Sequence, residues 1–144
     1  MKVKAIAYFK IKDISEITLL SIREWNKAKE IKSVPRFIGW WWLCSPGYYS
    51  TLATCVYGSS ITNDYGDDVK YDFGRVRPAF KIPNLKLEIG SKIFVENTLC
   101  TVIDTDYALS DIAVCQHRFD KKSNDYETSE IKQFINSDEF KEML

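Results

Sequence analysis

The stretch that decides the fold is Trp40-Trp41-Trp42-Leu43-Cys44-Ser45-Pro46-Gly47, in which three successive tryptophans run into a turn signal. Each tryptophan buries roughly 150–250 Å² and needs a partner for its indole N–H, so at least one of the three must lie in the core. In a strand, successive side chains point to opposite faces, so we expect Trp40 and Trp42 on one face and Trp41 on the other. Residues 45–47 then end the strand, because proline lacks a ladder N–H and glycine accepts a positive φ. This pattern is typical of a strand in the middle of a two-sided fold.

Upstream of this strand, the sequence predicts a strand and a helix. Residues 2–10 alternate, which favours a strand with one face made by Val3, Ala5, Ala7 and Phe9. Ser21-Ile22-Arg23-Glu24 is a capping-box pattern that opens a helix, and the residue before Pro35 disfavours its continuation. The apolar stripe of this helix would consist of Ile22, Trp25, Ala28 and Ile31.

Downstream, short strands and two small helices are expected. Residues 52–56 and 69–73 read as strands around a loop at 63–68, where Asn, Asp and Gly favour turns. A meander follows at 93–95, 100–104 and 109–115, with turns at 96–97 and 105–106. Thr128 or Ser129 would cap one helix, and Ser137 would start a terminal one. The predicted fold class is α+β, with antiparallel sheets and two or three short helices.

The tryptophan stretch and Val76-Arg77-Pro78-Ala79-Phe80 together carry a family resemblance. They resemble the hallmark W-W-L-R-S-P-G, then a Tyr/Gly/Asn/Asp stretch, then G-V-R-P-A-F, of small bacterial and prophage domains of unknown function. With the helix start at Leu19 to Trp25, the resemblance extends over residues 17–82. It implies a C-type-lectin-like fold, related to sulfatase-modifying domains and phage receptor-binding variable domains. The chain departs from the hallmark at Cys44, where the family has arginine, and at Arg75, where it has glycine.

The C-terminal part carries a second resemblance, in an unexpected order. Residues 119–136 are similar to F-D-x-x-S-N-x-Y-x-x-S-x-I-R-x-W-L-N, an element that precedes the tryptophan segment in longer family members. Here it follows that segment, so the resemblance implies a circular permutation. Permutation is tolerated when the termini of one domain lie close together at its surface. We therefore expect a single domain over 1–144, with 1–82 holding the helix and tryptophan segments and 83–144 the meander and terminal helices. Two independent cores meeting near Pro83-Asn84 would contradict this expectation.

Composition narrows the classes of function. The chain has 144 residues with 20 basic and 20 acidic side chains, so its formal net charge is zero. This balance gives no electrostatic reason to expect direct contact with nucleic acid. No stretch approaches the roughly 20 apolar residues of a membrane span, and residues 1–7 lack the apolar region of a signal peptide. We expect no membrane partner and a cytoplasmic location in a bacterial host.

Motifs for catalysis and metal binding are sparse. His117 has no nearby nucleophile motif, and no glycine-rich phosphate loop is present. The four cysteines have no C-x-x-C spacing and are interpreted as buried thiols: Cys44, Cys55, Cys100 and Cys115. Four carboxylates have the ligand type that calcium prefers but not the spacing of an EF-hand loop, and a solvated turn is favoured: Asp64, Asp67, Asp68 and Asp72. We therefore predict no enzymatic activity, no cofactor and no metal.

Binding is the remaining class of function. The stretch from Tyr48 to Arg75 has the Tyr, Ser, Asn and Gly composition of a paratope, where rigid rings supply contact area at low entropic cost. Alternatively, the tyrosines line the edge of a sheet, with buried rings and solvated hydroxyls. The candidate residues for contact with a ligand or partner are Tyr48, Tyr49, Tyr57, Asn63, Asp64, Tyr65, Asp67, Tyr71 and Arg75.

Three hypotheses of function follow. The first is a phage-type binding protein that inhibits a host defence protein, such as a CRISPR effector, through protein–protein contacts. The second is a protein that sequesters a nucleotide-like small molecule, with tyrosines stacking the base and Arg75 or Arg77 contacting phosphate or ribose. The third, implied by the sulfatase-modifying relatives, is an oxidative enzyme that uses Cys44 or Cys55. An edge strand freed by permutation would also permit a homodimer.

Overall fold

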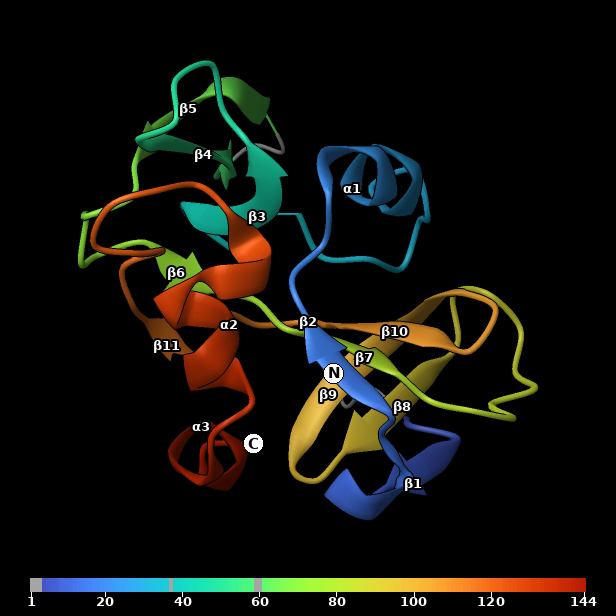
Figure 1. Ribbon diagram of the computed structural model, residues 1–144. Helices are drawn as coiled ribbons and strands as arrows, with labels where there is room; N and C mark the ends of the chain where they lie inside the picture. The colour runs from blue at the N-terminus through green and yellow to red at the C-terminus, as the bar shows by residue number, and fades with distance from the viewer. Residues whose placement is uncertain (1–3, 37, 59–60) are drawn as a thin grey trace.

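Two β-sheets and three short α-helices make up the part of the chain that the computed structural model describes, residues 4–36, 38–58 and 61–144 (Figure 1). The first sheet, sheet A, contains β1 (Ala7–Phe9), β2 (Glu16–Thr18), β7 (Ala79–Lys81), β8 (Lys92–Val95), β9 (Thr98–Asp104) and β10 (Tyr107–Ser110). The second, sheet B, contains β3 (Trp41–Pro46), β4 (Leu52–Tyr57), β5 (Ile61–Asp68), β6 (Arg75–Val76) and β11 (Cys115–Gln116). The helices are α1 (Ile22–Ala28), α2 (Glu130–Ile135) and α3 (Asp138–Glu142), with 3₁₀ turns η1 (Ile11–Asp13) and η2 (Tyr126–Thr128). The fold class is α+β, as predicted.

Both sheets are mixed, whereas the sequence predicted antiparallel sheets. Sheet A has the order β1-β8-β9-β10-β7-β2 and sheet B the order β11-β6-β3-β4-β5. Within them, β1 runs parallel to β8 and β3 runs parallel to β6, while the other pairs are antiparallel. Parallel strands need a long connection. Such pairs therefore join segments far apart in the sequence, where neither turn residues nor periodicity reveals the pairing.

The tryptophan strand is as predicted. Trp41 and Trp42 are fully buried in β3, and the ring centroids of Trp40 and Trp42 lie 4.6 Å apart on the same face. Trp41 points to the other face, where its ring centroid lies 4.9 Å from that of Trp25 in α1. The strand therefore packs on both sides, because its two faces carry equally large rings.

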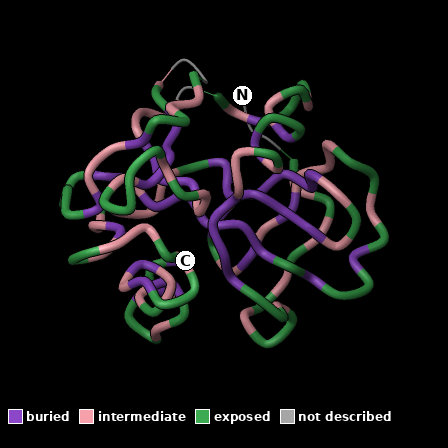
Figure 2. Tube along the Cα trace, turned by 45° about the horizontal axis from the view of Figure 1, so that its top comes forward, coloured by how far each residue is buried: buried purple, intermediate pink, exposed green. Residues whose placement is uncertain are grey.

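The hydrophobic core consists of two clusters, and each includes residues from both sheets. One cluster gathers Trp42 and Val76 of sheet B with Phe80 and Ile93 of sheet A. The other surrounds Trp41 and includes Leu109 of β10. Figure 2 shows buried segments running through both halves of the molecule. The core is thus not divided at Pro83, and both sheets take strands from either side of that residue.

The predicted helix starts are correct. Ser21 and Glu24 form the expected capping box: the Glu24 N–H donates to Ser21 Oγ at 3.1 Å, and the Ser21 N–H donates to Glu24 Oε1 at 2.8 Å. Ser129 caps α2 and Ser137 caps α3 through the same kind of bond. The helix α1 ends at Ala28, several residues before the end that Pro35 predicts. These starts are predictable because a cap involves only neighbouring residues.

The region after β4 differs from the prediction. The expected loop at 63–68 belongs to the eight-residue strand β5, and the expected strand at 69–73 is a turn. Pairing with β4 holds the polar residues extended, with Leu52 opposite Asp68, and Gly66 at φ 102° interrupts the register. Val69 is fully buried and fixes the turn to the core. Tertiary pairing thus overrides the turn preference of Asn, Asp and Gly.

Two further strands differ in extent. The first strand covers only Ala7–Phe9, and Val3 lies outside the described residues. The expected strand at 109–115 is split between β10 in sheet A and β11 in sheet B. The chain crosses from one sheet to the other at Asp111, whose carboxylate accepts from Lys92 Nζ at 2.6 Å and from the Thr101 hydroxyl at 2.6 Å. This largely buried ion pair lies at the crossing, between the end of β10 and the start of β11.

None of the helices in the described ranges is long and apolar enough to span a lipid bilayer.

Candidate binding surface

Three exposed tyrosines gather beside the hairpin of β4 and β5, and we call them the tyrosine triad: Tyr48, Tyr49 and Tyr65. Their exposed fractions are 72%, 57% and 53%. The rings of Tyr48 and Tyr65 stack with centroids 5.4 Å apart and planes 10° apart. Tyr49 meets both edge-on, at 4.8 Å from Tyr48 and 6.0 Å from Tyr65. Three of the predicted site residues therefore form one exposed aromatic cluster.

Backbone hydrogen bonds fix the segment that carries the triad. The Tyr48 N–H donates to the Tyr65 carbonyl at 2.8 Å, which ties the turn after β3 to β5. Gly47 lies so close to β5 that an added Cβ would stand 2.4 Å from the Tyr65 carbonyl oxygen. Only glycine permits this approach, so the Ser-Pro-Gly signal positions Tyr48 as well as ending β3.

The C-terminal part of the chain supports the same turn. Asn124 Nδ2 donates to the carbonyls of Tyr49 and Leu52, each at 3.0 Å, and the Asn124 N–H donates to the Ser50 carbonyl at 2.8 Å. Asn124 belongs to the Phe-Asp-x-x-Ser-Asn pattern, so this element contributes to the surface although it lies about 75 residues away. Asn124 is not among the site residues predicted from the sequence. Its place in the Ser-Asn part of that pattern is the one feature of the sequence that points to it.

A second group of predicted residues forms a hydrogen-bond network around Asp67. Its Oδ2 accepts from Trp40 Nε1 at 2.9 Å, from the Tyr57 hydroxyl at 2.6 Å, from Cys55 Sγ at 3.3 Å and from Asn63 Nδ2 at 3.4 Å. Asn63 Nδ2 also donates to the Tyr57 hydroxyl at 2.9 Å. Burial and the bond to Asp67 raise the pKa of Tyr57 to about 12. These bonds hold the Tyr57 hydroxyl in place. Asp67 acts in them as a hydrogen-bond acceptor for neighbouring side chains of the same chain.

Replacing Asp67 should loosen this network. We expect Asp67→Ala to lower the free energy of unfolding by about 1–3 kcal/mol, because several partly buried donors lose a charged acceptor. The pKa of Tyr57 should fall towards 10, its ordinary value, because part of the upward shift comes from Asp67. Urea unfolding and NMR titration of the Tyr57 ring carbon measure the two effects.

The matched control for this prediction is Asp64→Ala, which removes an exposed carboxylate from the same strand. It should change stability by less than about 0.5 kcal/mol. Equal losses in the two variants would contradict the prediction, because the hydrogen bonds to Asp67 would then add no more stability than an exposed carboxylate does.

The remaining predicted residues lie apart from the triad's ring contacts. Tyr71 stacks on Phe73 with centroids 5.0 Å apart, and Phe73 in turn lies 5.8 Å from Trp40. Asp64 is exposed. Arg75 is half-buried, and its Nη1 donates to the Ile38 carbonyl at 3.3 Å. Phe73 is 59% exposed, but it is not among the predicted contact residues. Its position two residues after Tyr71 would place both rings on one face of an extended segment.

Arg77 does not reach this surface. Its side chain is fully buried, with Nε donating to the Ser110 carbonyl and Nη2 to the Pro35 carbonyl, each at 2.8 Å. Its guanidinium carbon lies 4.9 Å from the centroid of Trp41 and 5.3 Å from that of Trp25. Of the two arginines considered for phosphate contact, only Arg75 therefore has access to solvent.

The cysteines are all free thiols, with Cys55 and Cys100 buried and Cys44 and Cys115 half-buried. Burial raises the pKa of Cys44 to about 12 and that of Cys115 to about 11, and it also raises the pKa of Cys55 and Cys100. At neutral pH these groups stay protonated, whereas the thiolate is the reactive form.

In the described residues, His117 and the aspartates are not grouped as a catalytic or metal-binding site. The His117 ring stacks on Phe134 at 4.3 Å, and its Nδ1 lies 2.6 Å from the Arg118 carbonyl. Within residues 4–36, 38–58 and 61–144, no three Asp, Glu, His or Cys side chains are grouped to hold a metal ion. Asp67, one of the four aspartates considered for calcium, is instead engaged by the donors around it.

Comparisons with protein families, with curated proteins and with solved structures find no match to this chain.

Proposed function

We propose that this chain is a non-enzymatic binding protein that contacts a partner protein through the tyrosine triad. The observation that carries the proposal is the packing of Tyr48, Tyr49 and Tyr65 against one another while more than half of each side chain remains exposed. Exposed aromatic patches of this kind are common at interaction sites, where tyrosine supplies apolar area and a hydroxyl for hydrogen bonding.

The rigidity of the surface supports the same proposal. Bonds from Asn124 hold the turn of Tyr49, and the contact of Tyr48 with Tyr65 ties that turn to β5. A partner would bind rings that are already ordered, so less conformational entropy is lost on association. Aromatic residues of this type are enriched among the few residues that dominate binding energy.

The fold proposal is a C-type-lectin-like domain with a permuted order of segments. The order of the two resembling segments is what this proposal rests on. In the structure, β1 pairs with β8, and the Leu144 carbonyl accepts from the Asn97 N–H at 2.9 Å, directly after β8. In this fold, the loop-rich region that carries the triad would present the ligand contacts, as the family resemblance implies.

The narrower proposal is that the partner is a host defence protein, with the chain acting as a phage-type inhibitor. The nucleotide-sequestering alternative has weaker support, because Arg77 is buried and Arg75 is the one arginine of the pair left to meet a phosphate. The oxidative alternative has the least, because the raised pKa of each thiol opposes formation of the thiolate.

A partner captured from bacterial host lysate would provide the test. Its affinity is measured for the unmodified chain and for a Tyr48→Ala/Tyr65→Ala variant by isothermal titration calorimetry. We expect the double variant to bind at least about 30-fold more weakly, because loss of an interface hot spot costs about 2 kcal/mol or more. Asn124→Ala should weaken binding by a smaller factor, because it removes only the support of the turn.

The matched control is Tyr8→Ala, which removes an equally exposed tyrosine from β1 in the other sheet. Its affinity should equal that of the unmodified chain. A partner that binds the triad variant as tightly as the unmodified chain would refute the assignment of this surface.

A further inference from the structure

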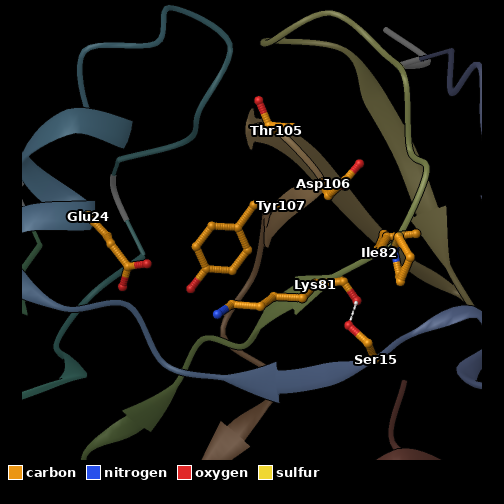
Figure 3. A pocket seen from close by; sticks show the side chains of 8 residues that line it. Ser15, Glu24, Lys81, Ile82, Thr105, Asp106 and Tyr107 are labelled. Carbon is orange, nitrogen blue, oxygen red and sulfur yellow. Dashed lines mark hydrogen bonds between the residues drawn. The ribbon is translucent and has the colours of Figure 1, made fainter.

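A pocket of about 400 Å³ opens between α1, the end of β7 and the turn from β9 to β10 (Figure 3). Its wall includes Glu24 from α1, Lys81 from β7, Tyr107 from β10 and the apolar pair Ile82 and Pro83. No residue of the tyrosine triad lines it, and the proposed function does not use it. Its volume lies near the lower end of the roughly 300–1,000 Å³ typical of small-molecule sites.

Three polar groups of the wall face a common space. In Figure 3, the Glu24 carboxylate, the Tyr107 hydroxyl and the Lys81 ammonium point toward one another from three different elements. The bond from the Ser21 N–H to Glu24 Oε1 fixes the carboxylate at the wall. The Tyr107 side chain is buried, and Lys81 Nζ lies 5.7 Å from its ring centroid. The site therefore has a fixed anion, a fixed hydroxyl and a cation.

The three groups differ in how firmly they are held. Burial and the nearby Glu24 charge raise the pKa of Tyr107, so its hydroxyl stays protonated and can donate a hydrogen bond. The ion pair of Lys81 with Glu16 is long, at 3.8 Å, and about half of the Lys81 side chain is exposed. An exposed pair of this kind is weak, so a ligand anion can replace Glu16 as the partner of Lys81.

The charges define the class of ligand. A polyphosphate would meet a single lysine against the carboxylates of Glu24 and Asp106, which disfavours a nucleotide in this pocket. A ligand with one ammonium and one carboxylate would satisfy Glu24 and Lys81 together. The apolar surface of Ile82 and Pro83 would contact an uncharged side chain next to that pair of charges.

We propose that this pocket binds a free zwitterionic α-amino acid, with Glu24 holding its ammonium group, Lys81 its carboxylate and Tyr107 donating to the same carboxylate. The proposal is independent of the partner surface. It assigns a ligand site to Tyr107, a buried phenol beside two charged side chains.

Isothermal titration calorimetry with the standard amino acids tests the proposal on the full chain. We expect at least one apolar amino acid to bind with a Kd of about 1 mM or below, and its amide and its des-amino acid to bind at least about tenfold more weakly. Failure of every amino acid to bind would overturn the proposal, and so would an amide or a des-amino acid that binds as tightly as the amino acid itself.

Two variants locate the binding. Lys81→Met and Tyr107→Phe should each weaken the best amino acid by about tenfold or more, whereas Lys12→Met, a change of an exposed lysine in η1, should leave the Kd unchanged. Circular dichroism confirms that each variant is folded. An unchanged affinity in folded Lys81→Met would also overturn the proposal.

The same titration separates this pocket from the tyrosine triad. The Tyr48→Ala/Tyr65→Ala variant should bind the amino acid as the unmodified chain does, even though its partner affinity is lost. Loss of amino-acid binding in that variant would mean that the ligand lies on the triad and not in the pocket.

Discussion

Arg77→Ala should lower the free energy of unfolding by about 3–5 kcal/mol, as expected for truncation of a large, fully buried side chain. Arg77 joins three parts of the fold: its guanidinium lies against Trp25 and Trp41 and donates to the carbonyls of Ser110 and Pro35. Truncation therefore leaves a cavity between α1 and β3 and removes the donors of two carbonyls. Urea unfolding followed by circular dichroism measures the loss.

A second substitution separates packing from charge. Desolvation lowers the pKa of Arg77 to about 10, so the guanidinium is still charged at neutral pH and its burial is unfavourable. In the described part of the chain, its Nη1 has no hydrogen-bond partner. Arg77→Met keeps most of the volume and removes the buried charge, so we expect a smaller loss of about 1–3 kcal/mol from the unpaired carbonyls.

Arg36→Ala is the matched control, because Arg36 is exposed one residue after Pro35. It should change stability by less than about 0.5 kcal/mol. If Arg77→Ala were no more destabilising than Arg36→Ala, Arg77 would not be the link between α1 and the two sheets.

Trp42→Ala should be similarly destabilising, by about 3–5 kcal/mol. The Trp42 side chain is fully buried, its ring lies 5.6 Å from that of Phe119, and its Nε1 donates to the His117 carbonyl at 2.9 Å. The contact with Phe119 links β3 to the C-terminal part of the chain. Thermal and urea unfolding followed by circular dichroism measure the change.

Trp42→Phe and Trp40→Phe form a matched pair that remains informative if Trp42→Ala does not fold. Each removes one indole N–H, but the acceptor of Trp40 is the Asp67 carboxylate, which keeps its other donors. Trp42→Phe leaves the partly buried His117 carbonyl without this donor and should cost about 1–3 kcal/mol, while Trp40→Phe should cost less than about 1 kcal/mol. Equal costs would mean that the hydrogen bond from Trp42 to His117 adds no stability of its own.

Local signals in the sequence predicted the features that depend on neighbouring residues. The capping residues Ser21, Ser129 and Ser137 start their helices as expected, and the two faces of the tryptophan strand follow from alternation alone. The composition of the stretch from Tyr48 to Tyr71 left two alternatives open, an exposed contact surface or tyrosines with buried rings at a sheet edge. It did not predict that Tyr48 and Tyr65 would stack, because that contact depends on the pairing of two segments.

The sequence by itself therefore determined the α+β class, the caps, the tryptophan strand and the residue types of the candidate surface. Only the tertiary structure decided which strands pair in parallel, that residues 63–68 extend β5, and that Asp67 accepts from Trp40 and Tyr57. It also brought Glu24, Lys81 and Tyr107 to one pocket. The physical reason is range: caps and alternation depend on residues a few positions apart, whereas pairing and pockets depend on contacts between distant segments, whose energies outweigh local preference.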